Sequence, residues 1–459
     1  MRGKTTLCGS AAVLLVALGV VSGDATRTQP ARAQPSAHDL GLDTVAGVSA
    51  GALPTDRRPA LASATWCGTS SPVDLTPNVL AGAPVHWIYA TPSDGQDRLS
   101  TFASAMQTDA ESIDAWWRSQ DSTRAPRNDL AQFTCGAQLD VSTMRMTFSS
   151  LELTPFVGRW EKLFTALNGA GFRSRFTKYL IYYDGPVAEE NICGQGGGDA
   201  SGFGYAVVYT QACPGISTAA VAAHELLHTM AAVPSGAPNL CPPEAGAHTC
   251  DDFNDIMFPV VGEAVALSAK VLDPGRNDYY GHASGFTDAQ DSAWLVQLDR
   301  QVPFTVTISG PGQVQGDVPG LQCTTTCTTT WNTDTQLALS ATPGAGAKLV
   351  RWSGGCGGAS ACNVTLAPGG SVSALFAPIV YRLTVSVGGR GTVRTSRPGI
   401  TCRPRCSAAF PSYVPLRLTA KPAKGWRFRA WSGACRGWRP NCTVPMTAAT
   451  RARAVFGRV

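Results

Sequence analysis

The chain has 459 residues, of which 44% are hydrophobic and 15% are charged. This composition excludes a disordered protein, and the length exceeds that of one ordinary domain, so two or three domains are expected. The net charge of +5 conceals an asymmetry, because residues 63–302 carry 13 Lys and Arg against 26 Asp and Glu, whereas residues 380–459 carry 16 Lys and Arg and no acidic residue. An acidic region is therefore joined to a strongly basic one.

The first residues have the pattern of an export signal. Arg2 and Lys4 precede the apolar run 11–21, which is too short to span a bilayer. We expect a signal peptide at residues 1–25, followed by a leader or short pro-segment at residues 26–62 that is rich in Ala, Pro and Ser. No later stretch predicts a transmembrane anchor, so the expected location is secreted and extracellular, with wall association left open.

Residues 63–302 are expected to form the first folded domain, in which strands and helices interleave. Strands are predicted at residues 85–90, 141–148, 178–183 and 205–210, and helices at 97–118, from Ser217 or Thr218 onward, and at 287–300. We interpret the glycine-rich residues 193–198 as a mobile loop beside the substrate edge strand 205–210. This order of elements predicts an α+β domain.

The remaining residues are a duplication. RWSGGC at residues 351–356 returns as AWSGAC at residues 430–435, and the cysteines of one copy recur in the other. Short alternating segments between Gly- and Pro-rich turns predict two small all-β repeats, at residues 303–379 and 380–459. We expect a local disulfide between each close pair of cysteines, which are Cys323–Cys327, Cys356–Cys362, Cys402–Cys406 and Cys435–Cys442.

The placement of these cysteines resembles divergent internalin-type B-repeat modules, which occur on secreted and surface-attached bacterial proteins. In the second repeat, Trp426 and Trp438 stand among arginines. Interleaved Arg and Trp without an acidic residue favour an anionic polymer of the cell wall as the partner of residues 380–459. Nucleic acid is not expected as the natural partner.

HELLH at residues 224–228 supplies candidate metal ligands and a candidate general base. Histidines four apart share one face of a helix, so His224 and His228 can bind one metal ion, and Glu225 can act on water there as a general base. With six His and eight Glu in the chain, chance would place an HExxH about 0.001 times. The apolar residues around the motif predict a buried helix, where unpaired histidines would be costly.

HELLHTMAAV followed downstream by DIMF resembles the metzincin zinc peptidases. The resemblance implies a mixed-sheet catalytic domain, zinc ligands at His224 and His228, Glu225 as the base, and Met257 in the turn beneath the metal. Two positions depart from the family pattern, because Ala231 replaces a glycine at a sharp turn and Pro234 replaces the third ligand. The helix is therefore expected to continue to about Val233, and the third ligand to come from a later loop.

His248 is favoured as that third ligand, since imidazole is the commonest partner of two histidines on zinc, and Asp251 is the alternative. Glu244 follows two prolines and Asn239 is a neutral amide, so both are disfavoured. HxxDDxxDIM, at residues 248–257, also resembles secreted actinobacterial peptidases related to metzincins. A Cys241–Cys250 bridge is expected to bring His248 to the metal. Asp255 is expected to fix the methionine turn through backbone hydrogen bonds or to orient a ligand histidine.

The predicted function is that of a secreted zinc-dependent endopeptidase, with Zn²⁺ as cofactor and a protein or peptide as substrate. Two alternatives stay open: an extracellular binding protein with an inactive peptidase domain, and a zinc hydrolase of non-peptide amides such as wall cross-links. Structural Ca²⁺ is also open, at Asp251–Asp252 or elsewhere in the acidic region. Tyr280 is considered as an oxyanion donor, with simple packing as the favoured interpretation.

Overall fold

The computed structural model describes residues 38–40, 66–74, 80–188, 192–213, 217–242, 246–259, 266–397, 399–412 and 414–459. The predicted signal peptide at residues 1–25, the leader at residues 26–62 apart from residues 38–40, and Glu244 lie outside these described residues. Within the described ranges, no helix is both long enough and apolar enough to cross a membrane.

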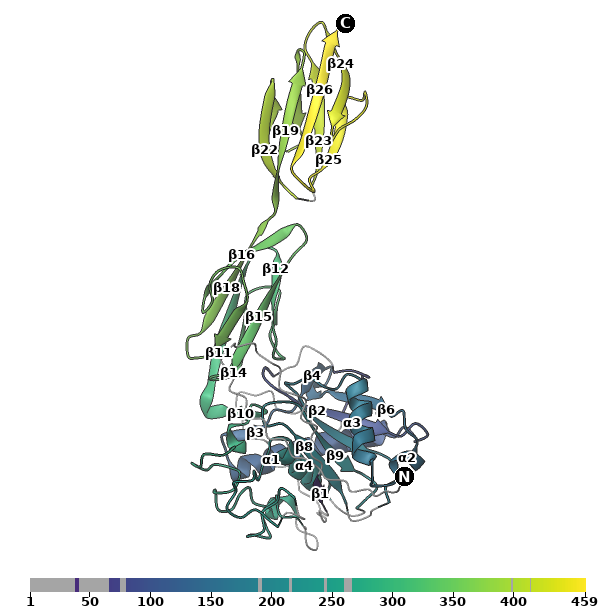
Figure 1. Ribbon diagram of the computed structural model, residues 1–459, viewed down its shortest axis with the longest axis vertical. Helices are drawn as coiled ribbons and strands as arrows, with labels where there is room; N and C mark the ends of the chain where they lie inside the picture. The colour runs from purple at the N-terminus through teal and green to yellow at the C-terminus, as the bar shows by residue number, and fades with distance from the viewer. Residues whose placement is uncertain are drawn as a thin grey trace, which may run out of the picture. The chain divides into compact units, whose positions relative to one another are not determined.

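One six-stranded mixed sheet frames the first region (Figure 1). Its order is β1 (His38–Leu40), β8 (Gly194–Gly198), β9 (Gly204–Tyr209), β7 (Lys178–Tyr183), β2 (Val85–Thr91) and β6 (Val141–Arg145). Strands β9, β7, β2 and β6 are parallel to one another, whereas β8 runs antiparallel to β9 and β1 antiparallel to β8. Because β8 pairs with the free side of β9, residues 205–210 form an inner strand of the sheet. The prediction that they form an edge strand is therefore wrong.

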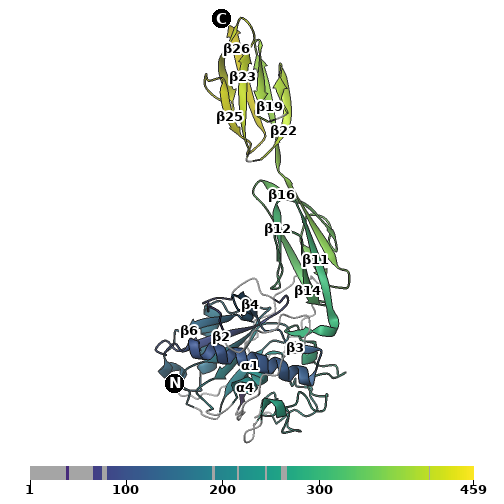
Figure 2. The same cartoon turned by 180° about the vertical axis from the view of Figure 1, so that it is seen from behind.

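Helices cover both faces of this sheet. On one face, α1 (Leu99–Gln120) and α4 (Thr218–Thr229) pack against side chains such as Trp87 and Leu180. On the other, α3 (Arg159–Gly169), preceded by the single turn α2 (Ser150–Leu153), packs against Ile88 and Ile181. Successive residues of a strand point to opposite faces, so these alternating side chains build two separate cores. Helix α3 lies in front of the sheet in Figure 1, whereas α1 lies in front of it in the view from behind (Figure 2).

Two short strand pairs complete the first region, and one of them corrects a prediction. The pairs are β3 (Arg124–Pro126) with β10 (Leu295–Gln297), and β4 (Leu130–Phe133) with β5 (Gly136–Leu139). The helix predicted at residues 287–300 is absent, and this segment instead contains η3 (Ala289–Asp291), β10 and η4 (Leu298–Arg300). Trp294, Leu295 and Val296 are all buried, and pairing with β3 satisfies the backbone of this apolar run. A further short helix is η2 (Leu267–Ala269).

The first repeat folds as two four-stranded sheets packed face to face. One sheet has the order β14-β11-β18-β16 and the other β13-β12-β15-β17. Their bounds are β11 (Gln301–Ser309), β12 (Gly312–Gly316), β13 (Gln322–Cys323), β14 (Cys327–Asn332), β15 (Gln336–Pro343), β16 (Ala347–Gly354), β17 (Cys362–Thr365) and β18 (Ser371–Pro378).

The second repeat has the same topology, with sheets β22-β19-β26-β24 and β21-β20-β23-β25. Its strands are β19 (Val380–Gly388), β20 (Gly391–Thr395), β21 (Thr401–Cys402), β22 (Arg405–Pro411), β23 (Pro415–Pro422), β24 (Trp426–Gly433), β25 (Asn441–Pro445) and β26 (Thr450–Arg458). Trp352 and Trp431 occupy matching buried positions in the two cores. The duplication in the sequence is thus a duplication of structure.

The predicted local disulfides of the repeats are confirmed, as Cys323–Cys327, Cys356–Cys362, Cys402–Cys406 and Cys435–Cys442. The expected Cys241–Cys250 bridge is also present, together with Cys193–Cys213 and Cys67–Cys135. Disulfides persist in oxidising compartments, so this framework fits an extracellular protein.

Candidate metal centre

Helix α4 carries the HELLH motif through the middle of the first core. The side chain of Ser217 accepts a hydrogen bond from the backbone N–H of Ala220 and so caps the helix N-terminus. The alanines that follow are buried, and their small side chains let the helix lie close to the sheet. His224 and Glu225 are fully buried and His228 nearly so. Polar side chains at such a depth require partners.

Three imidazoles converge beside this helix. Nε2 of His224 lies 3.0 Å from Nε2 of His228, which lies 3.1 Å from Nε2 of His248. The planes of the His224 and His248 rings are inclined by 25°, and their centroids are 5.3 Å apart. All three nitrogen ligand atoms fall within 4.8 Å of one another, although His248 is 20 residues from His228. The structure thus brings together the three histidines that the sequence analysis favoured.

The ring orientation of His224 is set from behind by the backbone. Nδ1 lies 2.5 Å from the carbonyl oxygen of Ile256, which is an acceptor only, so Nδ1 carries the proton and donates it. In the neutral ring, Nε2 then has a lone pair directed at the other two histidines. A backbone carbonyl that fixes the tautomer in this way is a common outer partner of metal-binding histidines.

Asp255 holds the turn that supplies this carbonyl. Its carboxylate accepts hydrogen bonds from the backbone N–H of Met257 at 2.8 Å, the hydroxyl of Thr249 at 2.8 Å and the phenol of Tyr279 at 2.5 Å. Burial raises the pKa of Asp255 to about 7, and these three donors oppose the rise. The predicted role of Asp255 in fixing the turn is borne out by the Met257 contact. Met257 itself is fully buried in the same core as α4.

His248 is held by a small covalent loop. The disulfide Cys241–Cys250 closes it, and the backbone N–H of Cys241 donates to the carbonyl of His248 at 2.8 Å. Thr249 then donates its N–H to the carbonyl of Met257, which joins the loop to the methionine turn. Asp251, the alternative ligand, is exposed and does not belong to the histidine group.

The helix ends earlier than predicted, at Thr229 instead of about Val233. Ala231 adopts the left-handed conformation with φ 57°. Its N–H bonds to the carbonyl of His228, and the next N–H, of Ala232, bonds to that of Leu227. These two bonds form the Schellman motif, in which glycine usually occupies the left-handed position. The sharp turn is therefore made without glycine, because the surrounding contacts outweigh the conformational cost to alanine.

The glycine-rich segment 193–198 is also corrected, since Gly194–Gly198 form the buried strand β8 and not a mobile loop. Helix α4 packs directly on this strand. A Cβ added at Gly194 would lie 2.5 Å from Oε1 of Glu225, and one at Gly204 on β9 would lie 2.8 Å from Cβ of Thr229. Glycine here makes room for the helix and for the Glu225 carboxylate.

Tyr280 does not reach the histidines by any contact found among the described residues. It is fully buried, its hydroxyl accepts from the indole N–H of Trp117 at 3.0 Å, and it lies 3.2 Å from a carboxylate oxygen of Asp121. Its packing role is therefore supported over a role as an oxyanion donor.

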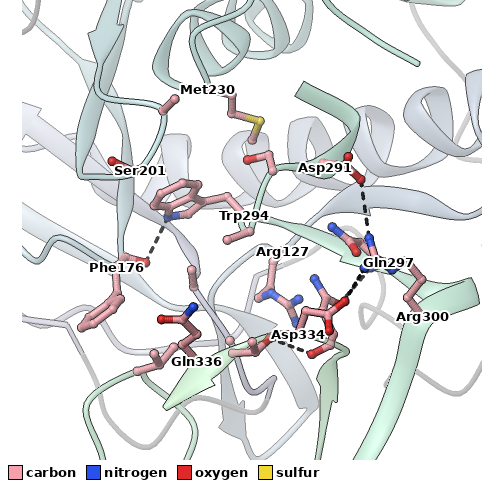
Figure 3. Close-up of a pocket in the computed structure, with 18 of the residues that line it drawn as sticks. Arg127, Phe176, Ser201, Met230, Asp291, Trp294, Gln297, Arg300, Asp334 and Gln336 are labelled. Atoms are coloured by element: carbon pink, nitrogen blue, oxygen red, sulfur yellow. Dashed lines mark hydrogen bonds and ion pairs between the residues drawn. The ribbon is translucent and has the colours of Figure 1, made fainter. Parts of the chain in front are cut away.

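A further pocket of about 510 Å³ is lined by residues such as Met230, Trp294 and Asp334 (Figure 3). The indole N–H of Trp294 donates to the carbonyl of Phe176 at 3.0 Å, and Arg300 forms ion pairs with Asp291 and Asp334. None of the three histidines, all of which the structure describes, lines this pocket.

A second buried group, around His86, was missed by the sequence analysis. His86 lies with Asp74, Asp129 and Asp140, and the ligand atoms of the four side chains are within 4.8 Å of one another. The four residues are spread over 67 positions of sequence without a motif, so only the fold reveals the cluster.

Comparison with known proteins identifies the C-terminal region. Residues 311–380 and 381–459 each match the family model described as the divergent InlB B-repeat domain. These residues are two B-repeat domains. The B-repeat match confirms the predicted resemblance, and it begins only after the first region. No curated protein matches the chain.

Several solved structures share a partial likeness with the chain. The major pilin T-13 of Streptococcus pyogenes is 8% identical, covering 35% of this chain and 97% of the pilin at a TM-score of 0.19. The Bacillus anthracis TIE protein is 6% identical over 34% of this chain and 33% of its own, at 0.22. Catalytically inactive OgpA from Akkermansia muciniphila, in complex with an O-glycopeptide substrate, is 8% identical over 87% of this chain and 100% of its own, at 0.24. TM-scores this low support no inference.

Proposed function

We propose that residues 63–302 form a secreted zinc endopeptidase, related in its site to metzincins, with His224, His228 and His248 as the zinc ligands and Glu225 as the general base. The observation that carries the proposal is the convergence of three buried Nε2 atoms next to a buried glutamate. Three neutral imidazoles are a donor set that zinc prefers, and three protein ligands leave one position open.

The geometry fits zinc in distance as well as in chemistry. Two nitrogens bound at 2.0–2.1 Å in a tetrahedron lie about 3.3 Å apart. The two adjacent Nε2 separations, 3.0 and 3.1 Å, are close to that value. Neutral imidazoles could share one proton across such a gap, but a single metal ion accounts for the approach of all three nitrogens.

Zinc, when bound, supplies Lewis-acid chemistry, which polarises a carbonyl and acidifies water. Glu225 provides the acid–base part. It follows His224 directly on α4, and its carboxylate lies against the glycines of β8. The carboxylate accepts a proton from the attacking water and transfers it to the leaving amine nitrogen.

The second B-repeat is proposed to attach the protein to an anionic wall polymer. Across one sheet, Arg405 on β22 pairs with Ser386 on β19, which pairs with Arg453 on β26. With Thr384, Arg451 and Ser432 they line a hollow of about 230 Å³. The three arginines are exposed, and residues 380–459 contain no acid to neutralise them. Guanidinium groups and hydroxyls together suit phosphate or carboxylate groups.

The first repeat supplies a natural comparison for this hollow. Thr305 pairs with Ser371 and Thr307 with Ser373, in the registers where the second repeat pairs Thr384 with Arg451 and Ser386 with Arg453. Thr326, 79 residues before Arg405, completes the set. The same fold therefore has Ser and Thr where the second repeat has arginine, so the basic face is not required for folding.

The peptidase proposal is tested by zinc content and casein cleavage. The wild type is expected to bind one zinc per chain and to cleave casein. Glu225→Ala should keep zinc and lose at least about 100-fold in rate, whereas His248→Ala should lose zinc. Asp251→Ala is the matched control and should keep both properties. If the wild type holds no zinc and cleaves nothing, the alternative of an inactive binding protein replaces the proposal. Cleavage of wall cross-links without cleavage of casein would favour the non-peptide amidase alternative.

The attachment proposal is tested on the full chain with inorganic polyphosphate as the probe. The triple variant Arg405→Thr, Arg451→Ser, Arg453→Ser copies the first repeat and should bind more weakly, with a shallower salt dependence by about two in log–log slope. The control, Arg394→Ser, Arg417→Ser, Lys421→Ser, removes equal charge from the other sheet. If both variants lose the same polyphosphate affinity, net charge alone accounts for the binding and the specific site is rejected.

A further inference from the structure

The buried cluster at His86 joins three parts of the first region. His86 lies on β2, Asp129 and Asp140 flank the β4–β5 hairpin, and Asp74 belongs to the segment before β2. His86, Asp129 and Asp140 are at most 1% exposed, and Asp74 is half-buried. The backbone N–H of Asp140 donates to the carbonyl of Asp129, which fixes the base of the hairpin over the start of β2.

His86 is already committed at both ring nitrogens. Nδ1 lies 2.8 Å from Oδ2 of Asp129, and Nε2 lies 2.9 Å from the hydroxyl of Ser142. Since a carboxylate only accepts, Nδ1 donates to Asp129, and the serine hydroxyl can donate to Nε2. The imidazole therefore orients the Asp129 carboxylate in the manner of an outer partner, and carboxylate oxygens remain as the inner ligands.

The charges of this cluster do not balance within it. Three carboxylates face one imidazole, and His86, Asp129 and Asp140 are almost completely buried. Crowded buried carboxylates are tolerated when they take up protons or bind a cation.

Two carboxylate oxygens favour a bound cation over the uptake of protons. Oδ1 of Asp74 and Oδ1 of Asp129 are buried, and neither has a hydrogen-bond partner among the described residues. Shared protons would place these oxygens in hydrogen bonds to one another or to neighbours. All ligand atoms of the cluster lie within 4.8 Å of one another. Two oxygens bound to one Ca²⁺ at 2.3–2.6 Å are at most about 5 Å apart, so these separations fall within the range that a shared ion requires.

We propose that Asp74, Asp129 and Asp140 bind one Ca²⁺ ion, with His86 holding Asp129 in position. Carboxylate oxygens suit hard cations, and zinc or copper would be expected to take imidazole nitrogen directly. Calcium tolerates irregular geometry and sheds water more readily than magnesium, which fits a site with little solvent. The ion is structural, because the cluster shares no residue with the histidine centre.

Such an ion fastens the N-terminal segment to the sheet. Ser71 already bridges Ser142 on β6, and the disulfide Cys67–Cys135 joins the same segment to the hairpin. Calcium bound by Asp74 would be a third attachment of this segment, in addition to the bridge and the disulfide. The inference does not rest on the peptidase proposal.

The test uses the full chain carrying Glu225→Ala, which removes self-cleavage, supplied with zinc and freed of calcium. Calorimetric titration with Ca²⁺ is expected to give one site per chain, and saturating Ca²⁺ should raise the melting temperature by several degrees. Asp129→Asn should abolish both effects.

Without calcium, the melting temperature of Asp129→Asn should equal or exceed that of its parent, because the variant removes one of three crowded carboxylates. The control Asp251→Asn, Asp252→Asn changes an acidic pair outside the cluster and should bind Ca²⁺ like the parent.

Asp74→Asn, at the half-buried end of the cluster, is the second variant in case Asp129→Asn fails to fold, and it should weaken Ca²⁺ binding at least tenfold. Absence of Ca²⁺ uptake by the parent, uptake unchanged in the cluster variants, or loss in the Asp251/Asp252 control would overturn the proposal. A second zinc equivalent that disappears in Asp129→Asn would overturn the choice of calcium. Zinc content is measured in the same samples, so a chain that binds Ca²⁺ but no zinc rejects the peptidase proposal alone.

Discussion

Gly196 on β8 lies directly against Glu225 of α4. A Cβ at Gly196 would stand 2.6 Å from the backbone oxygen of Glu225, 2.8 Å from its Oε2 and 3.0 Å from Cβ of His228. Real Cβ atoms do not approach backbone oxygen so closely, so any other residue would push the helix away from the sheet. The glycine-rich strand and the HELLH helix therefore form one structural unit, in which the strand sets the depth of the helix.

Gly196→Ala is predicted to destabilise the fold by about 1–3 kcal/mol and to weaken zinc binding, because the methyl group displaces the helix that carries His228. Thermal denaturation and zinc affinity measure the two effects. Gly169→Ala is the control, since a Cβ there meets no atom within 4 Å, and it should be neutral or slightly stabilising. Equal stability of both variants would contradict the close packing.

Ala231→Gly is predicted to stabilise the protein by about 0.5–1 kcal/mol. Alanine at φ 57° has a conformational cost of about 1–2 kcal/mol that glycine avoids, partly offset by the greater freedom of glycine in the unfolded chain. Denaturant unfolding measures the change. Ala223→Gly, inside α4, should act in the opposite direction, because glycine is unfavourable there and leaves a small cavity. A loss of stability in Ala231→Gly would show that the turn is not strained.

Removal of the Cys241–Cys250 bridge by two Cys→Ala changes is predicted to lower zinc affinity by about 10–100-fold, because the loop no longer holds His248 near the helix. Removing a disulfide that closes a loop of this size also lowers the free energy of unfolding by about 3 kcal/mol. Competition with a chromogenic chelator measures the affinity. The corresponding double change at Cys435 and Cys442, which close a similar loop in the second repeat, should leave zinc affinity unchanged. Wild-type zinc affinity without the first bridge would reject the role given to it.

Asp109 on α1 is predicted to make stability fall as pH rises. Burial raises its pKa to about 6, although the hydroxyls of Tyr182 and Thr218 donate to it. A carboxyl with a raised folded-state pKa contributes stability that is fully present below its unfolded value near 4 and is lost as pH rises through about 6. The shift corresponds to a change on the order of 3 kcal/mol.

Asp109→Asn removes this titration. Urea unfolding of the variant and its parent, both carrying Glu225→Ala, should agree near pH 4 and diverge in favour of the variant above pH 6. The difference between the two curves isolates Asp109 from every other titrating group. Parallel curves over this range would mean that the carboxyl is not buried in the folded protein.

Local pattern in the sequence was enough for the elements and for the motif. The alternating and fully apolar runs located β2, β6, β7 and β9, and helical spacing located α1 and α4, to within a few residues apart from the far end of β6 and the C-terminus of α4. The duplicated cysteines predicted the repeats and their disulfides, because each pair is close in sequence. HELLH placed His224, Glu225 and His228 on one helix, since spacing along a helix is fixed by its geometry.

Long-range packing decided the rest. The glycines of β8 predict a loop from the sequence, but they form a strand on which α4 packs. Residues 287–300 predict a helix, but part of this segment pairs with β3 as a strand. Left-handed Ala231 is stable only because tertiary contacts offset its local cost. His86, Asp74, Asp129 and Asp140 carry no spacing signal, because the backbone brings them together from separate segments. Sequence determines what each segment prefers by itself, whereas the tertiary structure alone decides which segments meet, and that depends on contacts between residues far apart in the chain.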